Sequence, residues 1–480
     1  FGATDNAAAI LSSMSISLIS LGRYDEAEAA CFKSIELQGP NSTALNNLGM
    51  VYLSWGQYDK ALEQFEASLD IGKKTGKKDL VAYINNIANI YELMGDDEKA
   101  LEYYFKSYEN AKSIGADSYL LTIVVNIVRS YSALGRYSEI TKWSGIYYDL
   151  QSTDLFSIEA LGEFDIIMGN IFRRGMRSDS TRVDRSIEAF SRSINTSREF
   201  GLKETEGRAL SGIGLTLMRI GEFGQAADSL RKAISIWEDL RRTATGSTRR
   251  DYLSKVIISY QDLVLCLVSV GDNNGVVEAI EQSKARLLGE YLTGIDSITT
   301  VTSTEHIQTK LSPDEALILY GNADLYELVQ VAITQDTVLV IESSLSDLIS
   351  KLYPDNENAT LELAVKSHRN FLKNIGPSNR TIPSSMELYN YLIEPLEAAI
   401  GTKQNWTILP DGILGYLPFE TLIDGDGKYV VESHHLRYSQ SLFVWNFIKD
   451  RPYEKHKKTL LALGGATYRP QSYEVDMIKN

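Results

Sequence analysis

Apolar positions recur with a helical period along roughly the first three hundred residues, and glycines interrupt them at nearly regular intervals. An apolar residue precedes each glycine, and a polar residue follows it. Glycine allows the left-handed backbone angles with which a tight turn ends a helix. The pattern therefore predicts helix–turn–helix units of roughly 34 to 40 residues. The glycines are Gly22, Gly56, Gly95, Gly135 and Gly221.

A small residue and then a larger one follow these turns at fixed offsets. Alanine lets two helices approach closely, and the larger side chain fills the space beside it. Ile140 is the exception among the small positions. The spacing predicts close packing of the two helices in each unit. The small positions are Ala27, Ala61, Ala100 and Ala226, and the larger ones are Cys31, Phe65, Tyr104 and Leu230.

The second unit resembles a tetratricopeptide repeat (TPR) almost completely. Its matching residues are Leu48, Gly49, Tyr52, Gly56, Tyr58, Ala61 and Phe65. A later unit with Gly169, Phe172 and Phe190 carries an insertion at 173–185. The resemblance extends from about residue 7 to 292 and implies an all-α superhelix of about seven helix pairs. Such arrays bind a protein or peptide partner in a concave groove.

Asparagines recur on the predicted first helices of successive units. Side-chain amides can hydrogen-bond a peptide backbone, so we predict that these residues line the TPR groove. The alternative is that they are solvated or make polar contacts between helices, and the sequence leaves both interpretations open. The residues are Asn46, Asn47, Asn85, Asn86, Asn89 and Asn126.

The pattern changes after Leu292. Residues 293–304 are rich in Ser, Thr, Asp and Gly and read as a linker. Short β-rich runs bounded by turns then predict strands, with helices between the third and fourth of them. Ser344 and Ser384 have the spacing of capping boxes at the starts of such helices. The predicted strands are 316–320, 326–333, 337–341, 406–409, 428–431, 436–438 and 459–463.

The chain carries a net charge of -15. An acidic chain is a poor match for nucleic acid or an anionic membrane, both of which need positive potential. No apolar run reads as long enough to span a bilayer. Only two cysteines occur, so a cytoplasmic location is the simplest expectation. Because the sequence begins with Phe1, we expect a processed or trimmed piece of a longer protein.

Four stretches together resemble a CHAT domain, a caspase- and separase-like cysteine peptidase family. They are 279–288, 311–320, 409–424 and 460–465. The resemblance implies that residues 305–480 form the N-terminal portion of a caspase-like α/β domain. The expected fold is therefore α followed by α/β, with the TPR superhelix first.

The resemblance also implies a histidine and a cysteine at the ends of two neighbouring strands. Both are expected after Asn480, so no catalytic residue is assigned within the chain. Gly464, Gly465 and Ala466 follow a predicted parallel strand, and we predict that they lie at the edge of the substrate cleft. Asp411, Glu420 and Asp424 are interpreted as turn or capping residues.

No cofactor and no metal is expected. The cysteines read as buried, and the adjacent His434 and His435 would point to opposite faces of a strand. The leading hypothesis is a cysteine endopeptidase regulated through its TPR array, in bacterial defence or signalling. The resemblance suggests an RNA-guided CRISPR effector or a gasdermin-like protein as partner or substrate. The alternative hypothesis is a non-catalytic TPR/CHAT scaffold.

Overall fold

The structure is a computed structural model that describes residues 2–151, 157, 160, 162–175, 181–243, 246–293, 303–321, 327–356, 358–373 and 383–450. It divides into two compact units, which are described separately. The helical unit comprises Phe1–Leu263, and the sheet unit comprises Val264–Asn480.

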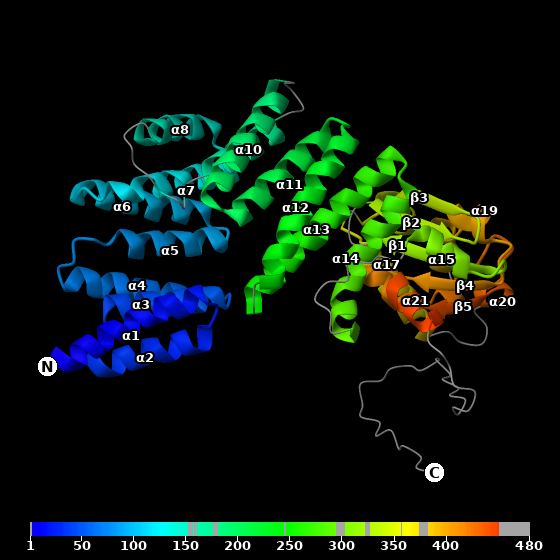
Figure 1. Cartoon of the computed structure of the whole chain (residues 1–480), viewed down its shortest axis with the longest axis horizontal. Helices are drawn as coiled ribbons and strands as arrows, with labels where there is room; N and C mark the ends of the chain where they lie inside the picture. The colour runs from blue at the N-terminus through cyan, green and yellow to red at the C-terminus, as the bar shows by residue number, and fades with distance from the viewer. Residues whose placement is uncertain are drawn as a thin grey trace, which may run out of the picture. The chain divides into compact units, whose positions relative to one another are not determined.

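The described residues of the helical unit form six helix pairs that stack in chain order, followed by the first part of α13 (Figure 1). In each pair the two helices are antiparallel neighbours joined by a short connection. The predicted helical repeat region is therefore confirmed. The pairs are α1 (Gly2–Ser20) and α2 (Tyr24–Gln38), α3 (Ser42–Ser54) and α4 (Tyr58–Lys74), α5 (Val81–Leu93) and α6 (Asp97–Ile114), α7 (Leu120–Ala133) and α8 (Tyr137–Gln151), α9 (Glu163–Arg174) and α10 (Thr181–Phe200), and α11 (Lys203–Arg219) and α12 (Phe223–Thr243).

The recurring glycine forms the turn within each of five pairs, as predicted. Gly56 has a φ of 71°, in the left-handed region. The N–H of Gln57 donates to the Tyr52 carbonyl, 2.9 Å away, and closes the end of α3. The same left-handed glycine ends the first helix of the other four pairs at Gly22, Gly95, Gly135 and Gly221.

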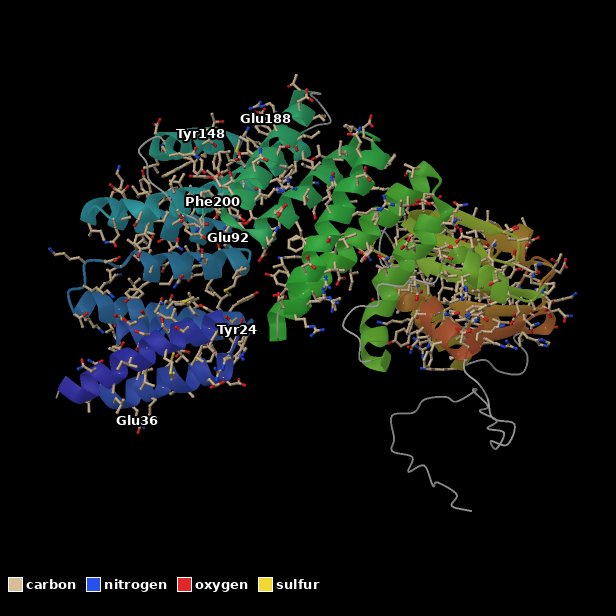
Figure 2. All side chains as sticks on the ribbon, viewed as in Figure 1. Tyr24, Glu36, Glu92, Tyr148, Glu188 and Phe200 are labelled. Carbon is tan, nitrogen blue, oxygen red and sulfur yellow. The ribbon has the colours of Figure 1, made fainter. Side chains whose placement is uncertain are left out.

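Aromatic rings pack directly against glycines of facing helices, both within a pair and between neighbouring pairs. The Phe65 ring lies so close to Gly49 that a Cβ there would be 2.6 Å from it. The Phe190 ring lies between Gly169 and Gly212, which come from α9 and α11. Side chains occupy the spaces between neighbouring ribbons (Figure 2). The predicted close approach of paired helices is therefore confirmed.

In three of the pairs, a serine on the second helix donates to a backbone carbonyl on the first helix. The sequence patterns did not predict these bonds. Ser34 donates to the Ala8 carbonyl at 3.0 Å, and Ser107 donates to the Val81 carbonyl at 3.1 Å. Ser68 donates to the Ser42 carbonyl at 2.5 Å. Each bond joins residues 26 positions apart, so the serine belongs to the repeat.

The division between the units falls within α13 (Gly246–Val270), and α14 (Asn273–Thr293) belongs to the sheet unit. This differs from the expected boundary at residue 292, because α14 packs against β3 and α21. Residues Asp251–Val270 of α13 are long and apolar enough to cross a membrane, with a mean hydropathy of 1.6. This is weak evidence, since core helices pass the same test, and it does not indicate a membrane protein.

The sheet unit contains a five-stranded mixed sheet in the order β3-β2-β1-β4-β5. The pairs β1–β2 and β2–β3 are antiparallel, whereas β1–β4 and β4–β5 are parallel. The first three strands are β1 (Glu315–Gly321), β2 (Glu327–Ile333) and β3 (Val338–Ser344), and the last two are β4 (Asn405–Leu409) and β5 (His435–Tyr438).

Alternate residues of the central strands enter a core formed with the helices that follow β3. Ala316, Ile318 and Tyr320 of β1 face this core. On α14, Ile280 lies against Gly321 at the end of β1. After α14, the described helices of the sheet unit are α15 (Thr304–Lys310), which precedes β1, and α16 (Leu345–Leu352), α17 (Leu361–Lys373), α18 (Pro383–Leu392), α19 (Glu397–Ile400), α20 (Val430–Ser433) and α21 (Leu442–Asp450).

Three local predictions for this unit were wrong. Residues 428–431 are not a strand, because α20 begins at Val430 and only Tyr429 makes an isolated bridge. Ser344 precedes α16 but makes no capping hydrogen bond, and Ser384 lies inside α18 rather than before it. The predicted strand 459–463 lies outside the described residues.

Candidate functional site

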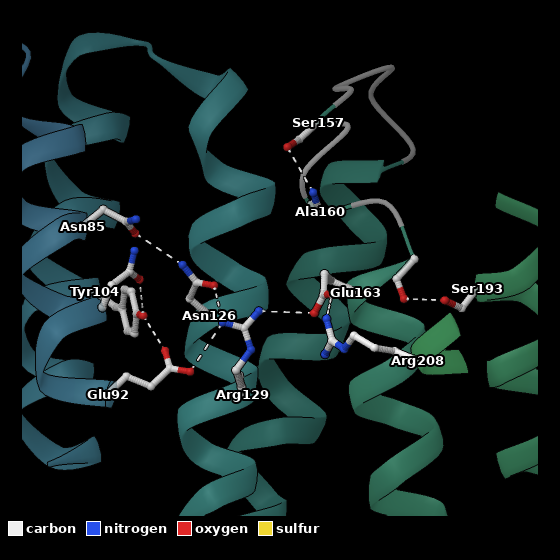
Figure 3. Close-up of polar contacts among 12 residues, drawn as sticks. Asn85, Glu92, Tyr104, Asn126, Arg129, Ser157, Ala160, Glu163, Ser193 and Arg208 are labelled. Atoms are coloured by element: carbon white, nitrogen blue, oxygen red, sulfur yellow. Dashed lines mark hydrogen bonds and ion pairs between the residues drawn. The ribbon is translucent and has the colours of Figure 1, made fainter. Parts of the chain in front are cut away.

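Acidic and basic side chains alternate across the first helices of four consecutive pairs (Figure 3). Arg129 of α7 lies between Glu92 of α5 and Glu163 of α9, with 3.5 Å from its guanidinium nitrogens to each carboxylate. Arg208 of α11 also pairs with Glu163. We call these four residues the charge ladder. It joins α5, α7, α9 and α11 into one polar surface.

The first helices carry the predicted asparagines beside this ladder. Asn126 donates to Asn85 at 3.4 Å and accepts from Arg129 at 3.0 Å. Asn86 donates to Asn46 at 2.9 Å. Asn89 and Glu92 both lie 2.6 Å from the Tyr104 hydroxyl. The amides therefore make contacts between helices, and whether they also contact a peptide stays a prediction.

Asn47 is the most buried of the six asparagines, at 2% exposed, although Asn46 and Asn126 are buried as well. Its amide donates to the Ser12 carbonyl at 2.9 Å and to the Ser15 hydroxyl at 3.0 Å. A peptide on the surface of the array cannot reach this amide in the structure, so Asn47 acts as a helix-to-helix contact. The adjacent Asn46 is 9% exposed and faces Asn86.

The ladder is balanced in charge and only partly exposed. Glu163 is 14% exposed and shared by two arginines, whereas Arg129 is 36% exposed. Burial and the neighbouring Glu92 raise the pKa of the Tyr104 hydroxyl far above its ordinary value, so it stays protonated as a donor. A ligand carboxylate could pair with Arg129 or Arg208 only by competing with Glu163. The surface can therefore exchange ion pairs with a protein partner.

Sequence reasoning missed the charge ladder. Charges are common on exposed helix positions, and only the stacking of pairs reveals which of them meet. The available signal was the spacing of Glu92, Arg129 and Glu163, which lie on equivalent first helices of successive units.

A second site lies in the sheet unit, where Lys284 of α14 reaches the carboxyl ends of two parallel strands. Its ammonium donates to the carbonyls of Tyr320 at the end of β1 and of Pro410 just after β4, the latter at 3.1 Å. Asp411 lies 3.6 Å away as its ion-pair partner. Burial lowers the pKa of Lys284, and Asp411 opposes that shift.

Glu281, one helical turn before Lys284, holds the start of α21. Its carboxylate accepts from the backbone N–H groups of Leu442 at 2.8 Å and Phe443 at 2.7 Å. These N–H groups lack partners within the helix, and the helix dipole favours a negative charge there. Burial nevertheless raises the pKa of Glu281. We call Glu281 and Lys284 the α14 clamp.

The stretch 409–424, which carries part of the CHAT resemblance, is a structural junction in the sheet unit. After β4 the chain enters a 3-10 turn, Gly412–Tyr416. Phe419 is buried against Tyr320, and its N–H donates to the Tyr438 hydroxyl at 3.0 Å. That hydroxyl donates to Glu420 at 2.6 Å. The stretch therefore connects β1, β4, β5 and α14.

The carboxylates of this stretch make structural contacts. Asp424 accepts from the backbone N–H groups of Asp426 and Lys428 at 3.0 and 2.8 Å, as a turn residue does. Asp411 pairs with Lys284, and Glu420 pairs with Tyr438. No pair of carboxylates suited to general acid and base chemistry is formed by these three residues.

His368 of α17 packs against the same stretch and is fully buried. Its Nε2 lies 2.9 Å from the Thr421 hydroxyl, which itself donates to the Pro418 carbonyl. The histidine therefore donates and remains neutral. Burial lowers its pKa from 6.5 to about 4.

The buried His368 predicts that acid weakens the sheet unit. The unfolded chain binds a proton below pH 6.5, whereas the folded chain resists protonation down to about pH 4. Stability is therefore complete above pH 6.5 and decreases by about 2–3 kcal/mol as the pH falls to 4. Hydrogen exchange of β1 at several pH values measures this. His368→Gln should flatten the profile, and an unchanged slope would contradict the assignment.

The described residues supply neither a metal centre nor a cysteine nucleophile. Cys31 and Cys266 are buried, and burial raises the pKa of the Cys31 thiol. Within the described ranges no cluster of three His, Cys, Asp or Glu residues could hold a metal. Gly464, Gly465 and Ala466, predicted at the edge of a substrate cleft, lie outside the described residues.

Comparison with known families identifies both regions. Residues 6–74 and 83–112 match models of the tetratricopeptide repeat. Residues 383–474 match a model of the CHAT domain. No curated protein matches the chain.

Solved structures similar to the chain are distant. Aspartyl phosphate phosphatase F from Bacillus subtilis is 13% identical, with a TM-score of 0.40 over 48% of this chain and 60% of that one. The apo quorum sensor NprR from B. thuringiensis is 12% identical, with a TM-score of 0.39 over 60% of this chain and 88% of that one. The chain thus spans less than two thirds of the first of these proteins.

Proposed function

We propose that this chain, which has a TPR-CHAT architecture of tetratricopeptide repeats followed by a CHAT domain, is the partner-binding and regulatory part of a caspase-like cysteine endopeptidase. The order of the two matched regions supports this proposal most directly. A setting in bacterial defence or signalling, and a cytoplasmic location, rest on the family resemblance alone.

The helical array is the proposed partner-binding part. TPR arrays bind proteins, and the charge ladder gives this array a polar surface across four first helices. Arg129 and Arg208 are about equally exposed, but both ion pairs of Arg129 are long at 3.5 Å, so a partner carboxylate would displace them more readily. No described residue favours a CRISPR effector or a gasdermin-like protein, so the proposed partner is a protein segment that carries carboxylates.

The α14 clamp is the proposed regulatory connection. The chain passes from the helical unit into the sheet unit within α13, and α14 follows after a short turn. Lys284 and Glu281 then hold the ends of β1 and β4 and the start of α21. A partner that changes the helical unit can thus act on the sheet through the covalent chain.

Peptide cleavage needs a thiolate that attacks the carbonyl, a base that accepts its proton and donors that stabilise the oxyanion. Neither buried cysteine suits the first role. The proposal therefore assigns the nucleophile and its histidine to residues outside the described part of this chain. In open α/β sheets, ligands bind at the carboxyl ends of parallel strands, which here is the edge that Lys284 contacts.

The test of cleavage uses the full-length protein encoded by the gene. New protein N-termini are counted in a lysate of the source cells after incubation with the protein, untreated or treated with iodoacetamide. We expect new N-termini only with the untreated protein, because Cys31 and Cys266 are buried and alkylation would reach an exposed nucleophile. If no thiol-dependent N-termini arise, the peptidase proposal fails.

Partner binding is tested separately with Arg129→Glu. The reversed charge would face Glu92 and Glu163. We therefore expect the variant to bind at least tenfold less of a lysate protein that the wild type retains. Lys142→Glu, an exposed position on the second helix α8, is the matched control and should retain it. Equal retention by Arg129→Glu would remove the charge ladder from the proposal.

A non-catalytic scaffold is the second candidate. The burial of both cysteines and the occupation of the strand ends by Lys284 favour it. It predicts partner retention that depends on Arg129, without thiol-dependent cleavage.

A further inference from the structure

The separation between successive helices of the helical unit becomes wider after α8. The second helix α4 packs along α5, and α6 packs along α7, whereas α8 and α9 approach less closely and meet through the stacked rings of Tyr147 and Phe164. A pocket of about 800 Å³ lies at this point and is lined by residues of α8, α9 and α10. This volume lies within the usual range for small-molecule sites.

The pocket has three distinct sides. Met168, Ile171 and Phe172 of α9 form an apolar floor. Along α8, Thr141, Ser144 and Gly145 leave room between two tyrosines, Tyr137 and Tyr148. Figure 2 labels Tyr148 on α8 and Glu188 on α10, which belong to opposite walls.

The α10 wall is basic, although the chain as a whole is acidic. It presents Arg182, Arg185 and Arg192 against a single carboxylate, Glu188. Arg192 is neutralised by Asp165 at 2.8 Å and Glu188 at 3.0 Å. Arg185 instead stacks over the Phe172 ring, with 4.1 Å from its guanidinium carbon to the ring centre. Among the described residues, no carboxylate lies within ion-pair distance of Arg185.

We propose that the pocket between α8, α9 and α10 binds an amphipathic anion, an apolar group that carries one negative charge. The apolar part would cover the floor of Met168, Ile171 and Phe172, and the anion would pair with Arg185. The ring of Phe172 holds that guanidinium in place, so little ordering is needed on binding. The site is distinct from the charge ladder, which lies on first helices.

The probe for this site is 8-anilinonaphthalene-1-sulfonate, an aromatic anion whose fluorescence rises in apolar surroundings. We expect one site per full chain. Arg185→Gln should weaken binding about tenfold, as expected for loss of a charge-assisted contact. Gly145→Trp should abolish binding by filling the pocket, since a Cβ at Gly145 meets no atom within 4 Å and the helix can accept it.

Two controls separate the site from non-specific dye binding. Lys142→Gln, on α8 but outside the pocket, should bind the dye like the wild type. N-Phenyl-1-naphthylamine, which has the same rings without the sulfonate, should bind the wild type and Arg185→Gln equally. If dye binding is the same in the wild type, Arg185→Gln and Gly145→Trp, the proposal is overturned.

Competition identifies the source of the anion. Decanoate represents a free amphiphile, and a synthetic peptide with paired leucines between glutamates represents a partner protein. Displacement of the dye by either supports the site and assigns its class of ligand. If neither displaces it at millimolar concentration, the pocket does not take amphipathic anions and the proposal fails.

Discussion

Lys284→Met is expected to destabilise the sheet unit by about 2–3 kcal/mol, the usual cost of removing a charged donor from partly buried acceptors. Methionine keeps the length of the side chain but leaves the carbonyls of Tyr320 and Pro410 without their donor. Asp411 also loses its cation. Hydrogen exchange of residues 315–321 and 405–409 in the full chain measures the loss directly.

The matched control is Lys403→Met. Lys403 also donates to a backbone carbonyl, that of Pro313 at 2.8 Å, but near the surface. Water can replace that donor, so we expect a loss below about 1 kcal/mol. Asp411→Asn should recover part of the stability of Lys284→Met, since the carboxylate that lost the ammonium becomes neutral. If Lys284→Met lowered the stability of the sheet unit as little as Lys403→Met, the α14 clamp would be dispensable.

The second large effect is expected at Gly169 and Gly212, which enclose the Phe190 ring. A Cβ at Gly169 would lie 2.8 Å from the ring, and one at Gly212 would be closer still. Replacing both with alanine should destabilise the helical unit by about 4 kcal/mol, because both faces of a buried ring are overpacked. Denaturant unfolding of the full chain, monitored by exchange in α9 to α11, is the measurement.

Gly145→Ala is the control, for which we expect a change of opposite sign in the free energy of unfolding. Its Cβ would meet no atom within 4 Å in the middle of α8, so alanine should stabilise by about 0.5–1 kcal/mol. Phe190→Leu should relieve part of the strain in the double alanine variant and destabilise the wild type. A double variant as stable as the wild type would mean that the ring can move aside.

The sequence predicted those features of the fold that repeat. Gly56 and its equivalents, and the Gly49–Phe65 and Gly169–Phe190 contacts, follow from the geometry of closely packed helix pairs. The buried strands β1 and β2 were also predictable, since their apolar runs are bounded by turns. The strand predicted at 428–431 was wrong because its three β-prone residues, Tyr429, Val430 and Val431, stand next to a turn and fit the start of a short helix equally well.

The candidate sites were less predictable because they depend on contacts between distant residues. The sequence marked Asn46 and Asn47 alike, yet Asn47 bonds back to α1 whereas Asn46 bonds forward to Asn86 of α5. Nothing in the pattern of α14 showed that Lys284 reaches Pro410, more than a hundred residues later. The family resemblance identified both stretches without indicating that they touch.

The parallel pairing of β1 with β4 also affects the order of folding. Contacts in the helical array join neighbouring repeats, so they form quickly and from the N-terminus onward during synthesis. The centre of the sheet, in contrast, joins Leu317 to Thr407, and the ribosome must make the whole intervening segment first. We therefore expect the array to be folded, and able to recognise a partner, before the sheet that it would regulate exists.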